Sequence, residues 1–181
     1  MFYRRHFSEY DIKKVLFIPV DEIEEYIQDM FISVEDHRFY SHCGISIEAM
    51  LNAYRSNRQL GYDKFGGSTI TQQLARTLFL IPVKSYFRKY LEIITALTME
   101  LVMSKKRILE LYINYAELGR GIFGIGSASL YYYTRSFYEI NRDEIIRLIA
   151  ILPNPLKYNV RTLFNNYHLD QRYRYLRFRF D

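Results

Sequence analysis

The sequence contains a single cysteine, Cys43, and no tryptophan. One cysteine excludes an internal disulfide and says nothing firm about the compartment. No apolar run approaches the roughly 20 residues that a membrane-spanning helix needs, and the nearest candidate is the short stretch Val15–Val20. The first residues are charged and have no apolar core, so we expect no signal peptide. Strand-like alternation is rare, which predicts a mainly helical chain.

The chain is rich in aromatic residues and in positive charge. Its 181 residues suit one domain with a sizeable core. They include 18 Tyr and 13 Phe, and the net charge is +5 at pH 7. This charge favours an anionic partner such as nucleic acid, phosphate groups or an anionic membrane surface.

Capping residues divide the chain into predicted helices. The predicted bounds are Asp21 with Glu24 to about Val34, Ser46 to Gly61, Thr69 with Gln72 to Pro82, Ser85 to Met103, a start at Ser104, and Asn141 with Glu144 to Leu152 before Pro153 and Pro155. Between the last two helices, the glycines predict a mobile or tightly turned loop. They are Gly119, Gly121, Gly124 and Gly126.

The stretch from Arg88 to Glu100 has the most unusual pattern. Its apolar residues recur at helical steps, at Leu91, Ile94, Leu97 and Leu101. Glu92 lies within one helical turn of Arg88 and Lys89, and it shares a face with Glu100. Two interpretations are open, namely a solvated face with ordinary ion pairs, or a carboxylate held among cations for a function.

The segment EDHRFYSHCG begins with two adjacent acids, Glu35 and Asp36. A carboxylate that leaves a buried helix and enters a partly desolvated cleft is suited to general-base work. Solvated acids at a helix end would give the same pattern. His37 and His42 suggest a metal site, but no third ligand lies at a recognisable spacing.

The segment GGSTITQQLAR places glycines before a predicted helix start, where the first amides favour an anion. Ser68, Gln72 and Arg76 follow a four-residue step and share one face. Glycines that merely form a turn are the alternative. The segment lacks the Lys-Ser/Thr ending of a nucleotide P-loop, which argues against ATP binding.

Five motifs occur in register along the chain. They are EDHRFYSHCG, GGSTITQQLAR, RKYLEIITALTME, KKRILELYINYAELGRGIFG and ILPNPLKYN. Together they resemble the peptidoglycan glycosyltransferases, glycosyltransferase family 51, and most closely the monofunctional biosynthetic members, which have no transpeptidase domain. The resemblance spans roughly residues 17–160. It implies a mainly α, lysozyme-like domain with a large helical lobe and a small membrane-proximal lobe.

This resemblance divides the chain into an N-terminal segment (1–16), the glycosyltransferase domain (17–160) and an aromatic-basic tail (161–181), which we expect to belong to the same domain. Family members normally carry an N-terminal transmembrane helix that is not visible here, so either it was removed or this version docks peripherally. The tail sequence RYRYLRFRF leaves two interpretations open. It either lies on an anionic interface or packs as a terminal strand or helix.

Enzymes of the family polymerise lipid II. The GlcNAc 4-hydroxyl of one substrate attacks the MurNAc anomeric carbon of the growing chain, with inversion and release of undecaprenyl pyrophosphate. By resemblance, the catalytic glutamates are Glu35, as the base, and Glu92, which orients cations or a divalent metal, Mg²⁺ or Mn²⁺. The substrate-binding residues carried over are Ser68, Gln72, Gln73, Arg76, Arg88, Lys89 and Arg120. The family usually has Lys where this chain has Arg76, so a planar fork replaces a point charge.

We expect no tightly bound cofactor. The expected partners are lipid II, the nascent glycan chain, the membrane surface and other cell-wall synthesis proteins, without nucleic acid. The expected location is the extracytoplasmic face of the bacterial cytoplasmic membrane. The alternatives are a lysozyme-like glycan hydrolase, which needs a general acid and an attacking water, and a non-catalytic lipid II-binding scaffold, which would be expected to have lost Glu35 or Glu92. A nucleic-acid-binding protein fits the charge but not two glutamates among cations.

Overall fold

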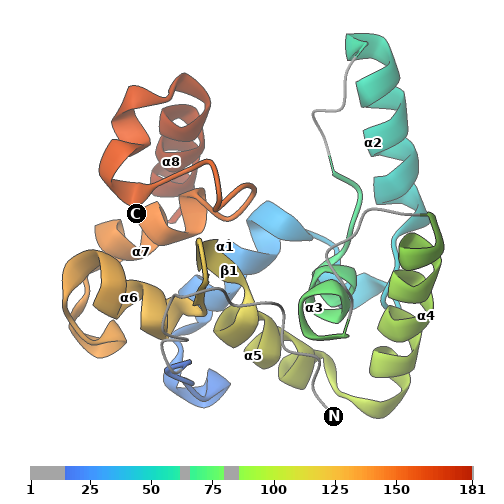
Figure 1. Ribbon diagram of the computed structural model, residues 1–181, viewed down its shortest axis with the longest axis horizontal. Coiled ribbons are helices and arrows are strands. Elements are labelled where there is room, and N and C mark those ends of the chain that lie inside the picture. The colour runs from blue at the N-terminus through green and yellow to red at the C-terminus, as the bar shows by residue number, and fades with distance from the viewer. Residues whose placement is uncertain (1–14, 62–65, 80–85, 181) are drawn as a thin grey trace.

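A computed structural model of the chain describes residues 15–61, 66–79 and 86–180, and Figure 1 shows their arrangement. The α-helices are α1 (Glu25–Glu35), α2 (Ile47–Leu60), α3 (Ile70–Phe79), α4 (Tyr86–Val102), α5 (Lys105–Tyr115), α6 (Ile125–Tyr133), α7 (Arg142–Ala150) and α8 (Tyr167–Phe180). The shorter elements are the 3-10 helices η1 (Val20–Glu22), η2 (Phe39–Ser41), η3 (Phe137–Glu139) and η4 (Val160–Asn165), and the strands β1 (Glu117–Gly119) and β2 (Ile122–Phe123). The prediction of a mainly helical chain is therefore confirmed. None of the helices in the described part of the chain is long and apolar enough to cross a membrane.

The helices form two groups on either side of a central pair (Figure 1). Helices α1 and α5 lie in the centre, α6, α7 and α8 lie on one side, and α2 and α4 lie on the other. Helix α3 packs against both α4 and α5, and α7 packs against α8. The core is apolar and continuous through the central and α6–α8 parts, where side chains such as Phe31, Leu109, Ile113, Ile146 and Leu163 are fully buried.

Several helix ends follow the predicted capping chemistry. The side chains of Ser46, Ser104 and Asn141 each accept the backbone N–H three residues later, at 3.0–3.2 Å. These bonds satisfy amides that a helix start leaves without an intrahelical partner. Gly61 ends α2 in the left-handed conformation, with φ 73°. The end predicted at Pro82 and the start predicted at Ser85 lie outside the described residues.

The capping pair predicted at Asp21 and Glu24 is wrong. Asp21 lies within η1, and Glu24 stands at the N-cap of α1 without a side-chain cap bond. The backbone N–H of Val20 is instead held by Glu110 Oε1 at 2.9 Å. The turn itself is closed by the N–H of Glu22 on the Pro19 carbonyl at 2.9 Å and the N–H of Ile23 on the Val20 carbonyl at 3.1 Å, and α1 begins at Glu25.

The glycine-rich stretch is tightly turned, because β1 and β2 pair as an antiparallel hairpin. Gly121 takes φ 71° in the turn, and Gly124 takes φ 79° immediately before α6. A Cβ at Gly124 would lie 2.2 Å from the carbonyl oxygen of Asn114, so a side chain there is excluded by both conformation and space. The hairpin therefore packs directly onto the end of α5.

Helix α4 turns its polar face toward the protein and much of its apolar face toward solvent. Its buried residues are Glu92, Ala96 and Met99, whereas Leu101 is 85% exposed and Ile94 is 41% exposed. The interpretation of the polar set as a solvated face is therefore wrong. Because α3 packs on this polar face, the carboxylates point inward and much of the apolar stripe points outward.

The C-terminal tail forms a packed helix. Leu169, Tyr173 and Leu176 of α8 are buried, and the helix lies against α7, η4 and α1. The spacing of these residues places them on one face of the helix. Of the two interpretations of the tail, packing as a terminal helix is therefore the one that the structure shows.

Candidate active site

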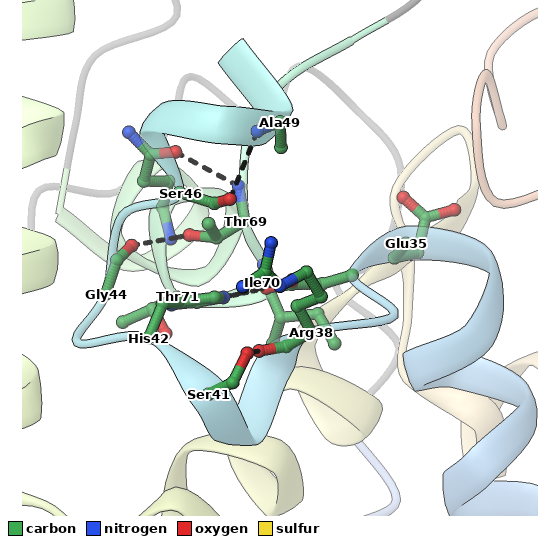
Figure 2. Close-up of polar contacts among 12 residues, drawn as sticks. Glu35, Arg38, Ser41, His42, Gly44, Ser46, Ala49, Thr69, Ile70 and Thr71 are labelled. Atoms are coloured by element: carbon green, nitrogen blue, oxygen red, sulfur yellow. Dashed lines mark hydrogen bonds and ion pairs between the residues drawn. The ribbon is translucent and has the colours of Figure 1, made fainter. Parts of the chain in front are cut away.

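Glu35 is the last residue of α1, and its side chain is 11% exposed. Both of its carboxylate oxygens accept hydrogen bonds. Arg172 Nη2 of α8 donates to Oε1 at 2.8 Å, and Gln73 Nε2 of α3 donates to Oε2 at 3.0 Å. Three elements distant in the sequence therefore meet at one carboxylate. Figure 2 shows this carboxylate projecting from the end of α1, apart from the contacts around Thr69.

Tyr112 of α5 fixes the orientation of the Gln73 amide. Its hydroxyl donates to Gln73 Oε1 at 3.0 Å, so the amide nitrogen faces Glu35. Burial, together with the nearby charge of Glu35, raises the pKa of Tyr112 well above its ordinary value. Tyr112 therefore stays a neutral donor throughout the range in which enzymes work.

Asp36 has a different role from its neighbour. It is buried, its Oδ2 accepts the backbone N–H of Ile70 at 3.1 Å, and both of its oxygens lie about 3 Å from His42 Nε2. Asp36 therefore joins the loop after α1 to the start of α3, and His42 is used in this contact. In the described ranges, no group of three or more His, Cys, Asp or Glu side chains could hold a metal ion.

The start of α3 is held by a second set of bonds. Thr69 and Gln72 make the reciprocal bonds of a capping box, at 3.0 and 3.1 Å, as the sequence predicted. Thr69 Oγ1 also donates to the Gly44 carbonyl at 2.6 Å (Figure 2). The Gln72 side chain is fully buried in this arrangement, so it acts within the helix start and lines neither cleft described below.

Two cations, Lys89 and Arg76, lie around the carboxylate of Glu92. Lys89 Nζ donates to Ser68 Oγ at 3.0 Å and to Glu92 Oε1 at 2.5 Å. Arg76 Nη1 lies 3.9 Å from Glu92 Oε2. The Glu92 carboxylate is 1% exposed, whereas Lys89 and Arg76 are 38% and 37% exposed. Glu92 thus lies beneath two cations that reach solvent.

Two clefts meet at Glu35. The larger cleft, of about 500 Å³, is lined by Glu35 and by residues that include Ser68, Gln73, Arg76, Tyr112, Glu117, Pro153 and Arg172. The smaller cleft, of about 290 Å³, is lined by Glu35 and by residues that include Ser46, Glu48, Asn52, Ser56, Gly67 and Ser68. Because Glu35 and Ser68 line both, a group bound in one cleft can approach a group bound in the other at this carboxylate.

The structure brings together most of the residues named from the sequence. Glu35, Ser68, Gln73 and Arg76 line the larger cleft, and Lys89 and Glu92 lie behind it. Two others do not line either cleft. Arg88 sits on α4 and lines neither cleft, and Arg120 is exposed in the turn between β1 and β2.

Two residues of the site were not predicted from the sequence, Arg172 and Tyr112. Arg172 was considered only as part of a basic tail. The helical spacing of Leu169, Tyr173 and Leu176 indicates a packed helix, but it does not say where the helix packs. Tyr112 lies within a predicted helix, and nothing local distinguishes it from the other tyrosines.

The domain is helical, and the largely buried carboxylate of Glu35 lies where two clefts meet. The cation Arg76 lines the larger of these clefts. A family model described as Transglycosylase matches residues 4–178. The chain therefore belongs to the transglycosylase family, and its fold is the lysozyme-like transglycosylase domain.

The chain is also similar to proteins named biosynthetic peptidoglycan transglycosylase. The protein of Dechloromonas aromatica (strain RCB) is 40% identical over 146 residues, which cover 81% of this chain and 63% of that protein. The protein of Haemophilus influenzae (strain PittEE) is 43% identical over 143 residues, covering 79% and 60%. That of Bordetella pertussis (strain Tohama I) is 41% identical over 150 residues, covering 81% and 62%. The chain thus spans about three fifths of the length of these relatives.

Proposed function

We propose that the chain is a peptidoglycan glycosyltransferase that polymerises lipid II into glycan strands. The observation that carries the proposal is Glu35, held by Arg172 and Gln73 where two clefts meet. Arg76 lines one of these clefts, and Lys89 bonds to Ser68, which lines both. Joining two sugars by displacement of a phosphate needs these three features, a base, two substrate sites and positive charge. The family membership and the names of the relatives support the same assignment.

In this proposal, Glu35 removes the proton of the attacking 4-hydroxyl. A carboxylate has about four lone-pair positions, and Arg172 and Gln73 occupy two of them. The remaining positions accept the substrate hydroxyl. Hydroxyl oxygen and anomeric carbon then form a bond, the bond to the pyrophosphate oxygen breaks, and the configuration inverts. The proton ends on Glu35.

The larger cleft takes the growing chain, whose pyrophosphate is the leaving group, because Arg76 lines this cleft. The leaving group is already acidic, so it needs positive charge rather than a proton. Arg76 and Lys89 supply that charge, and the buried carboxylate of Glu92 holds both cations in place. The smaller cleft takes the second substrate.

A divalent cation, Mg²⁺ or Mn²⁺, is a further part of the proposal. Mg²⁺ is commonly bound through one or two carboxylates together with substrate phosphates. Glu92 Oε2 is buried and accepts no hydrogen bond from the described residues, so it is the carboxylate oxygen that would hold the ion. When bound, the ion would neutralise charge on the pyrophosphate.

The membrane surface is a further partner in the proposal. The enzyme would act on the extracytoplasmic face of the bacterial cytoplasmic membrane, together with other cell-wall synthesis proteins. Lipid II is a membrane lipid. Helices α2 and α4 lie on one side of the molecule (Figure 1), and both expose large apolar side chains to solvent. These include Ile47, Leu51 and Tyr54 of α2 and Tyr86, Phe87, Leu101 and Val102 of α4. Exposed apolar patches beside basic residues are typical of membrane contact.

The test is incubation of the purified protein with labelled lipid II in detergent, followed by gel electrophoresis of the products. We expect a ladder of glycan polymer that muramidase digestion collapses. A parallel incubation contains preformed glycan in place of lipid II. Shorter products in that incubation, without polymer from lipid II, would indicate the hydrolase instead. Binding of lipid II without any product would indicate a non-catalytic scaffold.

A further inference from the structure

The C-terminal helix contributes directly to the site. We propose that Arg172 of α8 is a positioning residue, which holds the Glu35 carboxylate in the orientation that accepts the substrate proton. This inference rests on the proposed function, since it assigns a role within that reaction. It gives the aromatic-basic tail a part in catalysis rather than in membrane contact.

The backbone at position 172 is fixed by its neighbours. Leu169, Tyr173 and Leu176 are buried, so the face of α8 on either side of Arg172 is anchored in the core. The Tyr173 hydroxyl donates to Asp143 of α7, and Asp143 in turn accepts a bond from Arg147 at 2.7 Å. Arg172 therefore projects from a rigid support, and its guanidinium reaches Glu35 at 2.8 Å.

The contact constrains the carboxylate oxygen that Gln73 does not bind. Arg172 holds Oε1 and Gln73 holds Oε2, and the Gln73 amide is itself oriented by Tyr112. A glutamate side chain has several rotatable bonds, and two donors on different oxygens leave it one orientation. The side chains of Arg172 and Glu35 are only 25% and 11% exposed, so solvent screens this pair less than a surface pair. Without Arg172, Glu35 would keep one donor and gain freedom to turn away from the substrate.

Arg172 also lines the larger cleft, so a direct contact with the substrate's phosphates must be distinguished from positioning. A phosphate contact would weaken binding of lipid II whether or not Glu35 is a carboxylate. Positioning would lower the turnover rate and leave lipid II binding unchanged. A phosphate contact would therefore raise KM, whereas positioning would lower kcat. A binding assay on an inactive variant distinguishes the two roles as well.

The experiment compares wild type with Arg172→Ala, Arg172→Gln and a matched control, Arg174→Ala. Arg174 lies on the same helix, is 75% exposed and pairs with Asp170 of the same helix. We expect both Arg172 variants to lose about 10- to 100-fold in kcat, because a misplaced catalytic group can cost about 100-fold. Arg174→Ala should keep wild-type turnover. Circular dichroism and thermal unfolding verify that each variant is folded, and Arg172→Gln keeps the side-chain bulk if Arg172→Ala is unstable.

Two further measurements complete the test. Guanidinium chloride at non-denaturing millimolar concentrations should restore part of the activity of Arg172→Ala and none in Glu35→Gln, which a purely structural role would not predict. Lipid II binding by Glu35→Gln should be the same with and without Arg172→Ala.

Wild-type kcat in folded Arg172 variants, or failure of guanidinium to restore any activity, would overturn the positioning role. Weaker lipid II binding in Glu35→Gln/Arg172→Ala than in Glu35→Gln would assign Arg172 to the substrate instead. If wild type itself makes no polymer, the proposed function fails, which is distinct from these outcomes.

Discussion

The two sides of the molecule are built on different principles. Helices α5 and α7 bury most of their apolar residues in a continuous core, whereas α2 contributes no buried residue and α4 buries a glutamate, an alanine and a methionine. The apolar residues of α2 and α4 are not missing but face outward. The first side thus owes its stability to apolar packing, whereas the second buries few apolar side chains and exposes many. Glu35 lies between them, with one donor from α3 and one from α8.

The largest expected effect comes from neutralising Glu35, the carboxylate between the two sides of the molecule. Glu35→Gln keeps the shape of the side chain but cannot accept the hydroxyl proton, so polymerisation should fall by about 10²- to 10⁴-fold or more. Fold and lipid II binding should be retained. The measurement is the rate of polymer formation, with Glu25→Gln at the exposed start of α1 as a control that stays active. Near wild-type polymerisation by folded Glu35→Gln would exclude this residue as the base.

The contrast in packing predicts a contrast in stability. Leu109→Ala in α5 removes a fully buried side chain and should lower the free energy of unfolding by about 2–5 kcal/mol. Leu51→Ala in α2 removes a side chain that is 47% exposed and should change it by no more than about 0.5 kcal/mol. Urea unfolding followed by circular dichroism gives both values. Equal losses would mean that α2 is packed in solution and that the two sides do not differ.

On the polar side of α4, Glu92→Gln should slow polymerisation by about 10- to 100-fold. The change removes the charge that holds Lys89 and Arg76 together, and charge stabilisation by placed donors has effects of roughly this size or larger. Thr98→Ala, on the exposed side of the same helix, is the control. Added Mg²⁺ or Mn²⁺ should affect Glu92→Gln less than wild type if the carboxylate helps to hold the ion.

The pH–rate profiles of wild type and Glu92→Gln decide between two roles of this glutamate. An organising role leaves the shape of the profile unchanged. Loss of a basic limb only in Glu92→Gln would show that Glu92 transfers a proton as an acid.

The smallest effect concerns the outward-facing residues. Binding to anionic vesicles should weaken as salt rises, because the net charge of +5 contributes and salt screens it. Replacing Leu101 and Val102 by Ser should weaken binding by about tenfold, which corresponds to about 1.4 kcal/mol. Leu156→Ser, equally an exposed apolar position, is the control. Co-sedimentation measures all of these, and equal binding by the variants and the control would remove the α4 surface from membrane contact.

Local chemistry could be predicted from the sequence, and the direction of each helix face could not. The caps at Ser46, Thr69, Ser104 and Asn141 are confirmed because a cap depends on residues three positions apart. The cap at Asp21 failed because the chain forms a 3-10 turn there, in which the Ile23 N–H bonds to the Val20 carbonyl, and the Val20 N–H is held by Glu110, 90 residues away. No local pattern contains such a contact.

The motifs led to a compact group of residues, but they did not specify how those residues divide the work. Glu35 and Asp36 are adjacent, yet one lines two clefts and the other fastens α3 to the preceding loop. Gln72 and Gln73 differ in the same way, since Gln72 closes a helix start and Gln73 holds Glu35. Consecutive positions on a helix point about 100° apart, so the packing of α3 decides which of the two glutamines reaches the cleft.

The segment before α1 has a consequence for the order in which the chain acquires its structure. The amides of Leu16, Ile18 and Val20 bond to side chains of Ser127, Asn114 and Glu110, which lie 111, 96 and 90 residues later. Contacts with such long sequence separation form slowly, because a large loop must close before they gain anything. On the ribosome, the segment from Leu16 to Val20 must therefore wait until α5 and the first turn of α6 have emerged before it can dock. The segment from Leu16 to Val20 would therefore be synthesised before its partners and reach its native place only after them.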